Sequence, residues 1–236
     1  SLGNREDQRD VVTNIVSAVD IKLSTADFFS TIFSIIFKIS YQTYFLHYKT
    51  TIMKHLIIGG VAGGATAAAR IRRADESAEI VLLEKGKHIS YANCGLPYYI
   101  GGTIEERDRL FLQTPQSFKN RFNVDVRVEN EAINIDPAKK IVTVRKANGN
   151  EYTESYDNLL LSPGAHPVKP PLEGIDLEGI FTLRDVSDTD KIKNHITSHN
   201  IKRAVVVGAG FIGLEMAENL HHAGAEVIIV EMAKQV

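Results

Sequence analysis

The stretch Ala204-Val205-Val206-Val207-Gly208-Ala209-Gly210-Phe211-Ile212-Gly213 decides the fold. A short apolar run leads into three glycines at fixed spacing, and a second apolar run (227–230) ends at Glu231, 23 residues after Gly208. In such a turn the glycines allow a tight bend, a close approach of the backbone to a pyrophosphate, and close packing of helix on strand. The pattern predicts a strand–turn–helix–strand unit that binds a dinucleotide, with Glu231 on the ribose hydroxyls. An ordinary strand-to-helix turn is the plainer alternative.

A second glycine-rich turn lies earlier, at Gly59-Gly60-Val61-Ala62-Gly63-Gly64. It follows an expected strand (54–58) and precedes an expected alanine-rich helix (65–73). Another apolar strand (80–83) then ends at Glu84, 25 residues after Gly59. The turn departs from the usual pattern because Val61 stands at the second glycine position. We still expect a dinucleotide site here, with an ordinary turn as the alternative.

The segments between the two turns also alternate between strands and helices. A helical stretch with Phe118 and Phe122 precedes an expected strand (124–128). Asn148-Gly149 joins two apolar runs (141–144 and 152–156), which indicates a β-hairpin. A buried strand (159–161) and a helix (185–198) with Ser187 as its N-cap should follow. The predicted class is α/β, with parallel sheets in two nucleotide-binding units and a β-meander in the first.

The expected organisation is an extension outside the fold (1–52), a first nucleotide domain (53–165), a connecting segment with a helix (166–200) and the start of a second nucleotide domain (201–236). An apolar run in the extension (28–37) is shorter than the roughly 20 residues that span a bilayer. A membrane-associating amphipathic segment is the alternative for the extension. Because the second unit stops after its second strand, we expect the chain to be part of a longer protein.

Composition narrows the possible functions. The net charge is −2, without a long basic block, so we expect neither a nucleic-acid nor a membrane partner. Cys94 is the single cysteine, so no disulfide can form within the chain, and a reducing cytoplasm is the expected compartment. We expect no metal site. Any sulfur that Cys94 exchanges with must come from outside the chain.

The segment Asn93-Cys94-Gly95-Leu96-Pro97-Tyr98, together with both turns, resembles the flavin-dependent pyridine nucleotide-disulfide oxidoreductases. Within residues 53–236 it looks most similar to the single-cysteine subgroup, the coenzyme A-disulfide reductases and NADH-dependent persulfide reductases. The resemblance implies that the first domain binds FAD and the second binds NADH, with NADPH less favoured. Cys94 would be the catalytic residue. A structural role as a small buried hydrophobe is its alternative.

The resemblance also assigns the remaining site residues. Ser162-Pro163-Gly164 stands where the family usually has Ala-Thr-Gly near the flavin, so this turn departs from the family's pattern. The implied FAD residues are Gly59, Val61, Ala62, Gly63, Gly64, Glu84, Lys85, Asn93, Ser162 and Gly164. The implied NADH residues are Gly208, Gly210, Ile212, Gly213 and Glu231. The implied coenzyme A residues are Thr66, Arg70, Arg73, Ser90 and Asn93.

Arginines suit the phosphates of coenzyme A, since a guanidinium pairs with phosphate through two hydrogen bonds. Arg70, Arg72 and Arg73 are therefore candidates, and a solvated basic helix face is the alternative. The function implied is electron transfer from NADH through FAD to Cys94, which reduces coenzyme A disulfide or persulfide. The alternatives are an NADH oxidase or peroxidase that uses a sulfenic acid, and a non-catalytic nucleotide-binding fragment or redox sensor. A second FAD motif and a dimerisation domain, for a homodimer, would lie beyond Val236.

Overall fold

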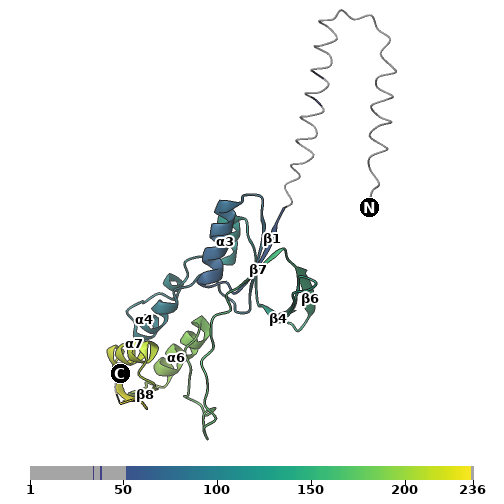
Figure 1. Cartoon of the computed structure of the whole chain (residues 1–236). Helices are drawn as coiled ribbons and strands as arrows, with labels where there is room; N and C mark the ends of the chain where they lie inside the picture. The colour runs from purple at the N-terminus through teal and green to yellow at the C-terminus, as the bar shows by residue number, and fades with distance from the viewer. Residues whose placement is uncertain (1–33, 35–37, 39–51, 235–236) are drawn as a thin grey trace, which may run out of the picture. The chain divides into compact units, whose positions relative to one another are not determined.

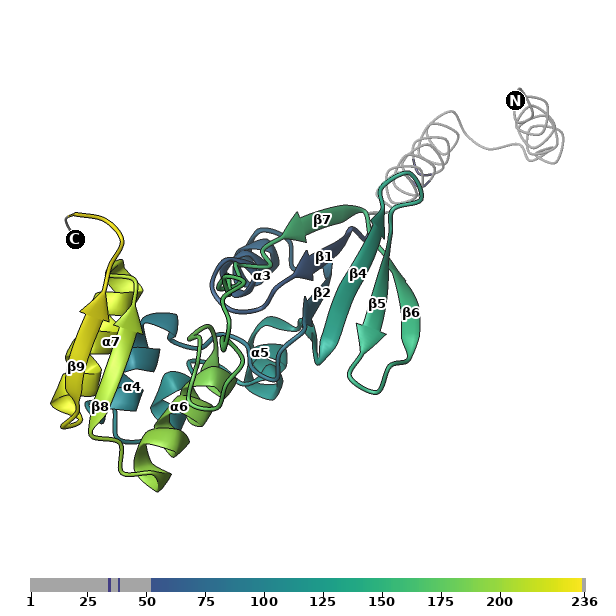
Figure 2. The same ribbon diagram turned by 90° about the horizontal axis from the view of Figure 1, so that it is seen from below.

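The first sheet has four parallel strands in the order β3-β2-β1-β7. β1 (Lys54–Ile58) pairs with β2 (Glu79–Glu84) on one side and with β7 (Asn158–Leu161) on the other. β3 (Asp125–Val128) extends the sheet beyond β2. α3 (Gly63–Ala74) connects β1 to β2, so the predicted strand–turn–helix–strand unit is present. Figure 1 shows α3 beside β1 and β7, and Figure 2 labels β2 as well.

The computed structural model describes Ser34, Lys38 and residues 52–234. The expectations for the extension (1–52) and its apolar run (28–37) lie almost entirely outside these residues. The described residues from Ile52 onward form one compact unit. Within the described part of the chain, none of the helices combines the length and the apolar character needed to cross a membrane.

The two faces of the parallel sheet are covered by different structures. Small side chains of α3 let the helix lie close to one face, where Ala65 and Ala68 pack around Ile57 and Leu82. The other face packs against a three-stranded antiparallel meander through Leu56 and other apolar side chains. The meander strands are β4 (Asn130–Asp136), β5 (Ile141–Lys146) and β6 (Glu151–Ser155). The hairpin predicted at Asn148-Gly149 is confirmed, because β5 and β6 pair across it.

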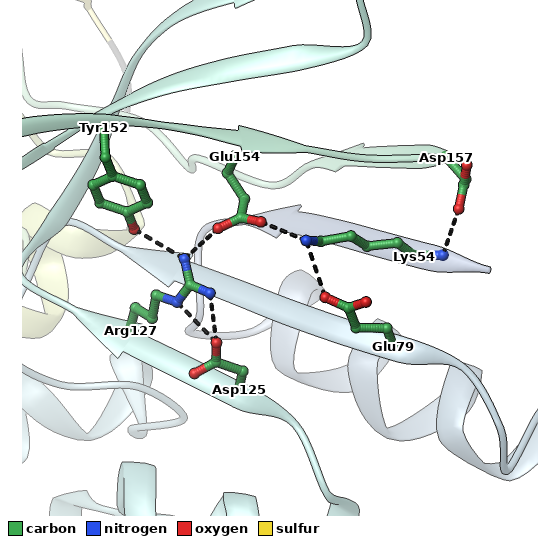
Figure 3. A network of polar contacts seen from close by, with 7 residues as sticks. All are labelled: Lys54, Glu79, Asp125, Arg127, Tyr152, Glu154 and Asp157. Atoms are coloured by element: carbon green, nitrogen blue, oxygen red, sulfur yellow. Dashed lines mark hydrogen bonds and ion pairs between the residues drawn. The ribbon is translucent and has the colours of Figure 1, made fainter. Parts of the chain in front are cut away.

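A polar network ties the meander to the parallel sheet (Figure 3). Glu154 of β6 is only 8% exposed, and its carboxylate accepts from Lys54 Nζ of β1 at 2.5 Å and from Arg127 of β3. Lys54 also pairs with Glu79 at 3.0 Å, and Arg127 with Asp125 at 2.6 Å. Burial alone would raise the pKa of Glu154, but the two cations outweigh it and hold that pKa below its usual value. The buried carboxylate is therefore ionised and paired.

One short helix is central to a second group of elements. α4 (Leu96–Gly101) contacts both α6 (Val186–Ser198) and α7 (Phe211–His222), as Figure 2 shows. α4 and α7 approach closely at Gly101, where a Cβ would lie 2.7 Å from Asn219 Oδ1. The other elements are the 3-10 turns η1 (Asn93–Gly95) and η2 (Arg107–Leu110), the helix α5 (Pro115–Phe122), and the parallel pair β8 (Arg203–Val207) and β9 (Glu226–Val230).

Two local expectations were wrong. The N-cap of α6 is Asp185 rather than Ser187, because the Asp185 side chain accepts from the amide of Asp188 at 3.0 Å. Residues 159–161 form a strand, but it is not buried: Leu161 is 59% exposed. The reason is that, among the described residues, β7 is an edge strand paired only with β1.

Candidate functional site

The first glycine turn (59–64) has the geometry of a phosphate-binding turn. Gly59 has φ +96°, and its amide donates to Leu83 O at 2.8 Å, which bends the chain back over the end of β2. A Cβ on Gly64 would lie 1.8 Å from Gly59 O, so only glycine allows α3 to start this close to the strand. Glu84 closes the turn, because its two carboxylate oxygens accept from the amides of Gly60 (2.8 Å) and Gly86 (2.7 Å).

The second glycine turn (208–213) repeats this arrangement. Gly208 has φ +98° and donates to Val230 O at 2.8 Å, and a Cβ on Gly213 would lie 2.0 Å from Gly208 O. The Glu231 carboxylate accepts from Ala209 at 2.6 Å and from Ala233 at 2.8 Å. Hydrogen bonds from Ala233 and then Ala209 keep the pKa of Glu231 below its usual value. Val61 thus takes the place of Gly210, as the sequence alignment of the two turns predicted.

The helices that follow the two turns share an open N-terminus. α3 and α7 have no side-chain cap and no acidic residue in the first turn, whereas α5 is capped by Thr114 and α6 by Asp185. The first amides of a helix have no partner within the helix, and together with the helix dipole they favour an anion. Both glycine turns therefore present a site suited to a phosphate group.

A cavity of about 640 Å³ lies over the first glycine turn. Its volume falls within the usual range for small-molecule and cofactor sites. Most residues implied for FAD line it together, namely Val61, Ala62, Gly63, Glu84, Lys85, Asn93, Ser162 and Gly164. Gly59 and Gly64 lie in the turn but are not among the lining residues. Gly63 lies against Ser162, where a Cβ would be 2.4 Å from the hydroxyl oxygen.

More than half of the cavity lining was not identified from the sequence. The additional residues are Gly86, Lys87, His88, Tyr91, Glu129, Glu131, Arg145, Lys146, Ala147, Pro163, His166, Arg184, Asp185, Val186 and Ser187. Burial raises the pKa of Tyr91 to about 12, so its phenol stays protonated and can donate a hydrogen bond. Burial, and then the charge of Arg107, lower the pKa of His88 and favour the neutral imidazole. His88 and Tyr91 could have been proposed as site residues from the sequence, because they lie only a few positions before Cys94.

Cys94 lies in the 3-10 turn η1 and is exposed. This exposure contradicts the alternative of a small buried hydrophobe. Its neighbour Asn93 lines the cavity, which places the cysteine segment at that site. Ser90 has φ +45°, unusual for a residue with a side chain, and its backbone is held between Gly60 O (2.9 Å) and the amide of Leu112 (2.9 Å).

The arginines of α3 divide into two kinds. Thr66, Arg70 and Arg73 are exposed and share one helix face through their spacing of four and three residues. Arg72 is poorly placed to bind a phosphate, because its guanidinium is already engaged by the backbone, whereas Arg73 makes one such bond, from Nε to Ala69 O at 3.2 Å. Arg72 donates to the carbonyl oxygens of Asp75, Glu76, Ala78, Phe122 and Asn123.

The residues implied for NADH lie in the turn between β8 and α7 and, for Glu231, just after β9. Gly210, Ile212 and Glu231 are exposed, whereas Gly208 and Gly213 are half-buried. Ile212 is 63% exposed, and a Cβ on Gly210 would meet no atom within 4 Å. Apolar side chains of β8 and β9 are also exposed, among them Val207 and Val230.

The fold and these two turns define an α/β protein with two dinucleotide-type sites and one exposed thiol. The sequence profile of the family described as "Pyridine nucleotide-disulphide oxidoreductase" matches residues 53–236, and the chain belongs to this family. The coenzyme A disulfide reductase of Staphylococcus haemolyticus is 44% identical over 184 residues, covering 78% of this chain and 41% of that protein. The NADH oxidase of Methanocaldococcus jannaschii is 41% identical, with the same coverage. The chain thus spans about two fifths of the length of these relatives.

Two solved structures share the fold with substantial identity. Reduced Bacillus anthracis CoADR-RHD superimposes with a TM-score of 0.77 at 50% identity, over 78% of this chain and 33% of that one. An NAD-dependent persulfide reductase from A. fulgidus gives a TM-score of 0.75 at 44% identity, over 78% of this chain and 34% of that one. These neighbours agree with the α/β class and the parallel sheets predicted from the sequence.

Proposed function

We propose that this chain is the N-terminal part of a flavin-dependent reductase in which electrons pass from NADH to Cys94, and from Cys94 to coenzyme A disulfide or a coenzyme A persulfide. The single observation that carries the proposal is the joint lining of one cavity. Three residues of the first glycine turn (61–63) line it together with Glu84 and Asn93, and Asn93 is followed directly by the exposed Cys94. The relatives named coenzyme A disulfide reductase and persulfide reductase support the same substrate class.

The residues of the cavity fit FAD. The uncapped N-terminus of α3 would receive the pyrophosphate. Gly63 lets Ser162 lie against the turn, because a Cβ there would be 2.4 Å from the Ser162 hydroxyl oxygen. Glu84 would accept from the ribose hydroxyls, as carboxylates at this position do in dinucleotide sites. Lys85, Ser162 and Gly164 would complete the site. FAD, when bound, supplies the two-electron chemistry between nicotinamide and sulfur, while the protein supplies position and field.

The second glycine turn would hold NADH in the same manner. The amides at the start of α7 would bind the pyrophosphate, and Gly210 leaves open space for it. Glu231 is ionised and oriented by two backbone amides, so it presents a fixed carboxylate to the ribose. Val61 and Ile212 would pack against the nucleotides rather than bond to them.

The thiol would act by exchange. Cys94, as the thiolate, would attack one sulfur of the coenzyme A disulfide, forming a mixed disulfide and releasing one coenzyme A thiolate. Two electrons would then cleave the mixed disulfide, releasing the second coenzyme A and restoring Cys94. Thr66, Arg70 and Arg73 would place the coenzyme A phosphates, together with Ser90 and Asn93 of the cysteine segment. Arg72 is not part of this set, because its guanidinium already donates to backbone carbonyl oxygens.

Turnover in the full-length protein would test this function. We expect NADH oxidation to be fastest with coenzyme A disulfide or persulfide, and slower with peroxide or oxygen. On the 236-residue chain itself, a visible spectrum with stoichiometric FAD would show that the cavity binds the flavin. A colourless chain that cannot be loaded with FAD would contradict the assignment of the first site.

An NADH oxidase or peroxidase is the second candidate. Its support is the exposure of Cys94, which would let peroxide reach the sulfur, and the relative named NADH oxidase. The same kinetic comparison separates the two. Fastest turnover with peroxide or oxygen, and a sulfenic acid on Cys94 after oxidation, would favour this candidate over the disulfide reductase.

A further inference from the structure

Three potential metal ligands gather at the C-terminal end of α6. The ligating atoms of Glu178, His195 and His199 all lie within 4.8 Å of one another. None of the three lines the cavity over the first glycine turn. The cluster is therefore separate from the site proposed for FAD and the thiol, and the sequence predicted no metal site here.

The local structure explains how the three side chains meet. His195 and His199 are four residues apart on α6, so they share one face of the helix. Glu178 comes from the irregular segment that precedes α6, where Gly179 has φ +87°, a conformation that favours glycine. The ring of His195 packs edge-on against Phe181 with centroids 5.1 Å apart, which restricts its movement.

The hydrogen bonds of His199 leave one ring nitrogen suited to a metal. Nδ1 lies 3.1 Å from His195 O and 2.9 Å from Ser198 Oγ, whose hydroxyl donates to Asn194 O at 2.7 Å. Both neighbours of Nδ1 are thus acceptors, so Nδ1 carries the hydrogen. Nε2 then has a free lone pair, the arrangement in which a metal-binding histidine is oriented by its other nitrogen.

The end of the helix also favours a cation. His199 is the C-cap of α6, where the last carbonyl groups and the helix dipole attract positive charge. Two imidazole nitrogens and one carboxylate oxygen form a ligand set typical of Zn²⁺, with a fourth position left for water. The ligand atoms lie within 4.8 Å of one another, and a bound Zn²⁺ would draw each to about 2 Å from the metal. Glu178 and His199 are exposed, so neighbouring atoms leave their side chains room to move.

We propose that Glu178, His195 and His199 form a Zn²⁺ site that fastens the irregular segment before α6 to the end of that helix. The site binds borderline transition cations, with Zn²⁺ or Co²⁺ as the probe. Because the metal binds the folded chain and joins two segments, it raises the midpoint of thermal unfolding as its concentration increases. The proposal does not depend on the proposed function, since none of its ligands belongs to the nucleotide or thiol sites.

The test uses the whole 236-residue chain carrying Cys94→Ser, so that the thiol cannot bind the metal. Calorimetric titration with Zn²⁺ should give one equivalent, and Co²⁺ should give a visible spectrum of low-coordinate cobalt. His199→Ala and Glu178→Gln should each weaken binding at least tenfold and remove the rise in the unfolding midpoint. The matched control is His221→Ala/His222→Ala, which removes two exposed histidines from the end of α7 and should change neither result.

Three outcomes would overturn the proposal. The first is the absence of a calorimetric signal for Zn²⁺ at micromolar chain concentration. The second is unchanged binding in His199→Ala or Glu178→Gln. The third is an equal loss of binding in the control variant. Glu178 and His199 are exposed, so we expect both single variants to fold. His195 is half-buried, and for that reason the test does not use a variant of it.

Discussion

Gly208 holds the position in the second glycine turn that Gly59 holds in the first. Both have a left-handed backbone, φ +98° and +96°. Both amides donate across 2.8 Å to the carbonyl oxygen of the residue just before the acidic residue of the turn, Val230 before Glu231 and Leu83 before Glu84. The turns thus place their helices and their acidic residues alike. They differ in surroundings, because the first lies under a cavity and the second is open to solvent.

The Gly213→Ala substitution should destabilise the second nucleotide unit. The new methyl group would lie 2.0 Å from Gly208 O, a backbone atom that cannot move without opening the turn. We expect a loss of about 1–3 kcal/mol in the free energy of unfolding, the usual cost of overpacking. Urea unfolding measures it. Gly210→Ala is the matched control, since its methyl group meets nothing within 4 Å, and equal stability of the two variants would refute the close approach.

Cys94→Ser should abolish disulfide reduction and leave flavin binding intact. A serine hydroxyl cannot form the mixed disulfide, whereas the cavity lining does not include the side chain of Cys94. The measurements are coenzyme A disulfide turnover in the full-length protein and the FAD content from its visible spectrum. Turnover that persists in the variant would rule Cys94 out as the reacting residue.

Glu231 should make the enzyme prefer NADH to NADPH. Its carboxylate is held by Ala209 and Ala233 where a 2′-phosphate would lie, and like charges repel. We expect at least a tenfold preference in kcat/KM, on the order of 1.4 kcal/mol. Glu231→Ala should reduce the preference for NADH over NADPH, because the repulsion of the 2′-phosphate is removed. Lys234 is a nearby cation and should make the preference of the unmutated protein smaller than Glu231 alone would. Steady-state kinetics of the unmutated full-length protein showing a preference for NADPH would contradict this role.

Glu154 should make stability depend on pH in the acid range. Its pKa is lower in the folded chain than the usual value of 4.5, so its contribution is fully present above pH 4.5 and is lost as pH falls through the folded value. Glu154→Gln leaves Lys54 and Arg127 without their shared partner. Because both are partly exposed, we expect a loss of about 1–3 kcal/mol at pH 7, less than for a fully buried pair.

Urea unfolding between pH 7 and pH 3 would measure this dependence. The unmutated chain should lose stability faster than Glu154→Gln as the pH falls through the acid range. Parallel curves for the two proteins would show that Glu154 does not titrate as the network predicts. Glu151→Gln, a change in the exposed Arg145 pair, is a suitable control.

Arg72→Ala should destabilise the chain, while Arg70→Ala should not. Arg72 fastens the end of α3 to the loop after α5 through hydrogen bonds to Phe122 O (2.8 Å) and Asn123 O (2.9 Å). Removing a charged donor from several carbonyl groups should cost about 2–4 kcal/mol. Arg70→Ala should change the free energy of unfolding by less than about 0.5 kcal/mol and instead raise the KM for coenzyme A disulfide. A reversal of these two effects would contradict the division of the arginines.

Most of the fold could be predicted from the sequence, because the patterns that indicate its turns and strands are local. Glycine spacing, short apolar runs and Asn148-Gly149 each specify a turn or strand without reference to the rest of the chain. The cap of α6 was missed because Asp185 and Ser187 are both suitable cap residues by type. The choice depends on the backbone at Asp185, which is extended.

The parts of the site that escaped prediction depend on long-range packing. Arg70 and Arg72 have the same side chain, and their roles differ only in the folded chain. Arg72 donates to Phe122 O, 50 residues later in the sequence, and this contact cannot be predicted from local spacing. Glu129 and Lys146 line the cavity because the meander packs on the sheet, and Arg184 because it lies against Gly164. None of these has a spacing that marks it as a ligand. The glycine turns and the thiol could be identified from the sequence, whereas most residues that line the cavity could be identified only from the structure.

The strand order β3-β2-β1-β7 has a consequence for synthesis of the chain. β1 acquires β2 soon after it emerges, but its other edge waits for β7, and Lys54 N reaches Asp157 Oδ2 across 103 residues. Such distant pairings form slowly, and an open strand edge invites pairing with other chains. The meander lies between β1 and β7 in the sequence. Its strands pair with near neighbours, so we expect it to form before β7 pairs with β1. Until residues 158–161 have been synthesised, the edge of β1 that later pairs with β7 is free to pair with another chain.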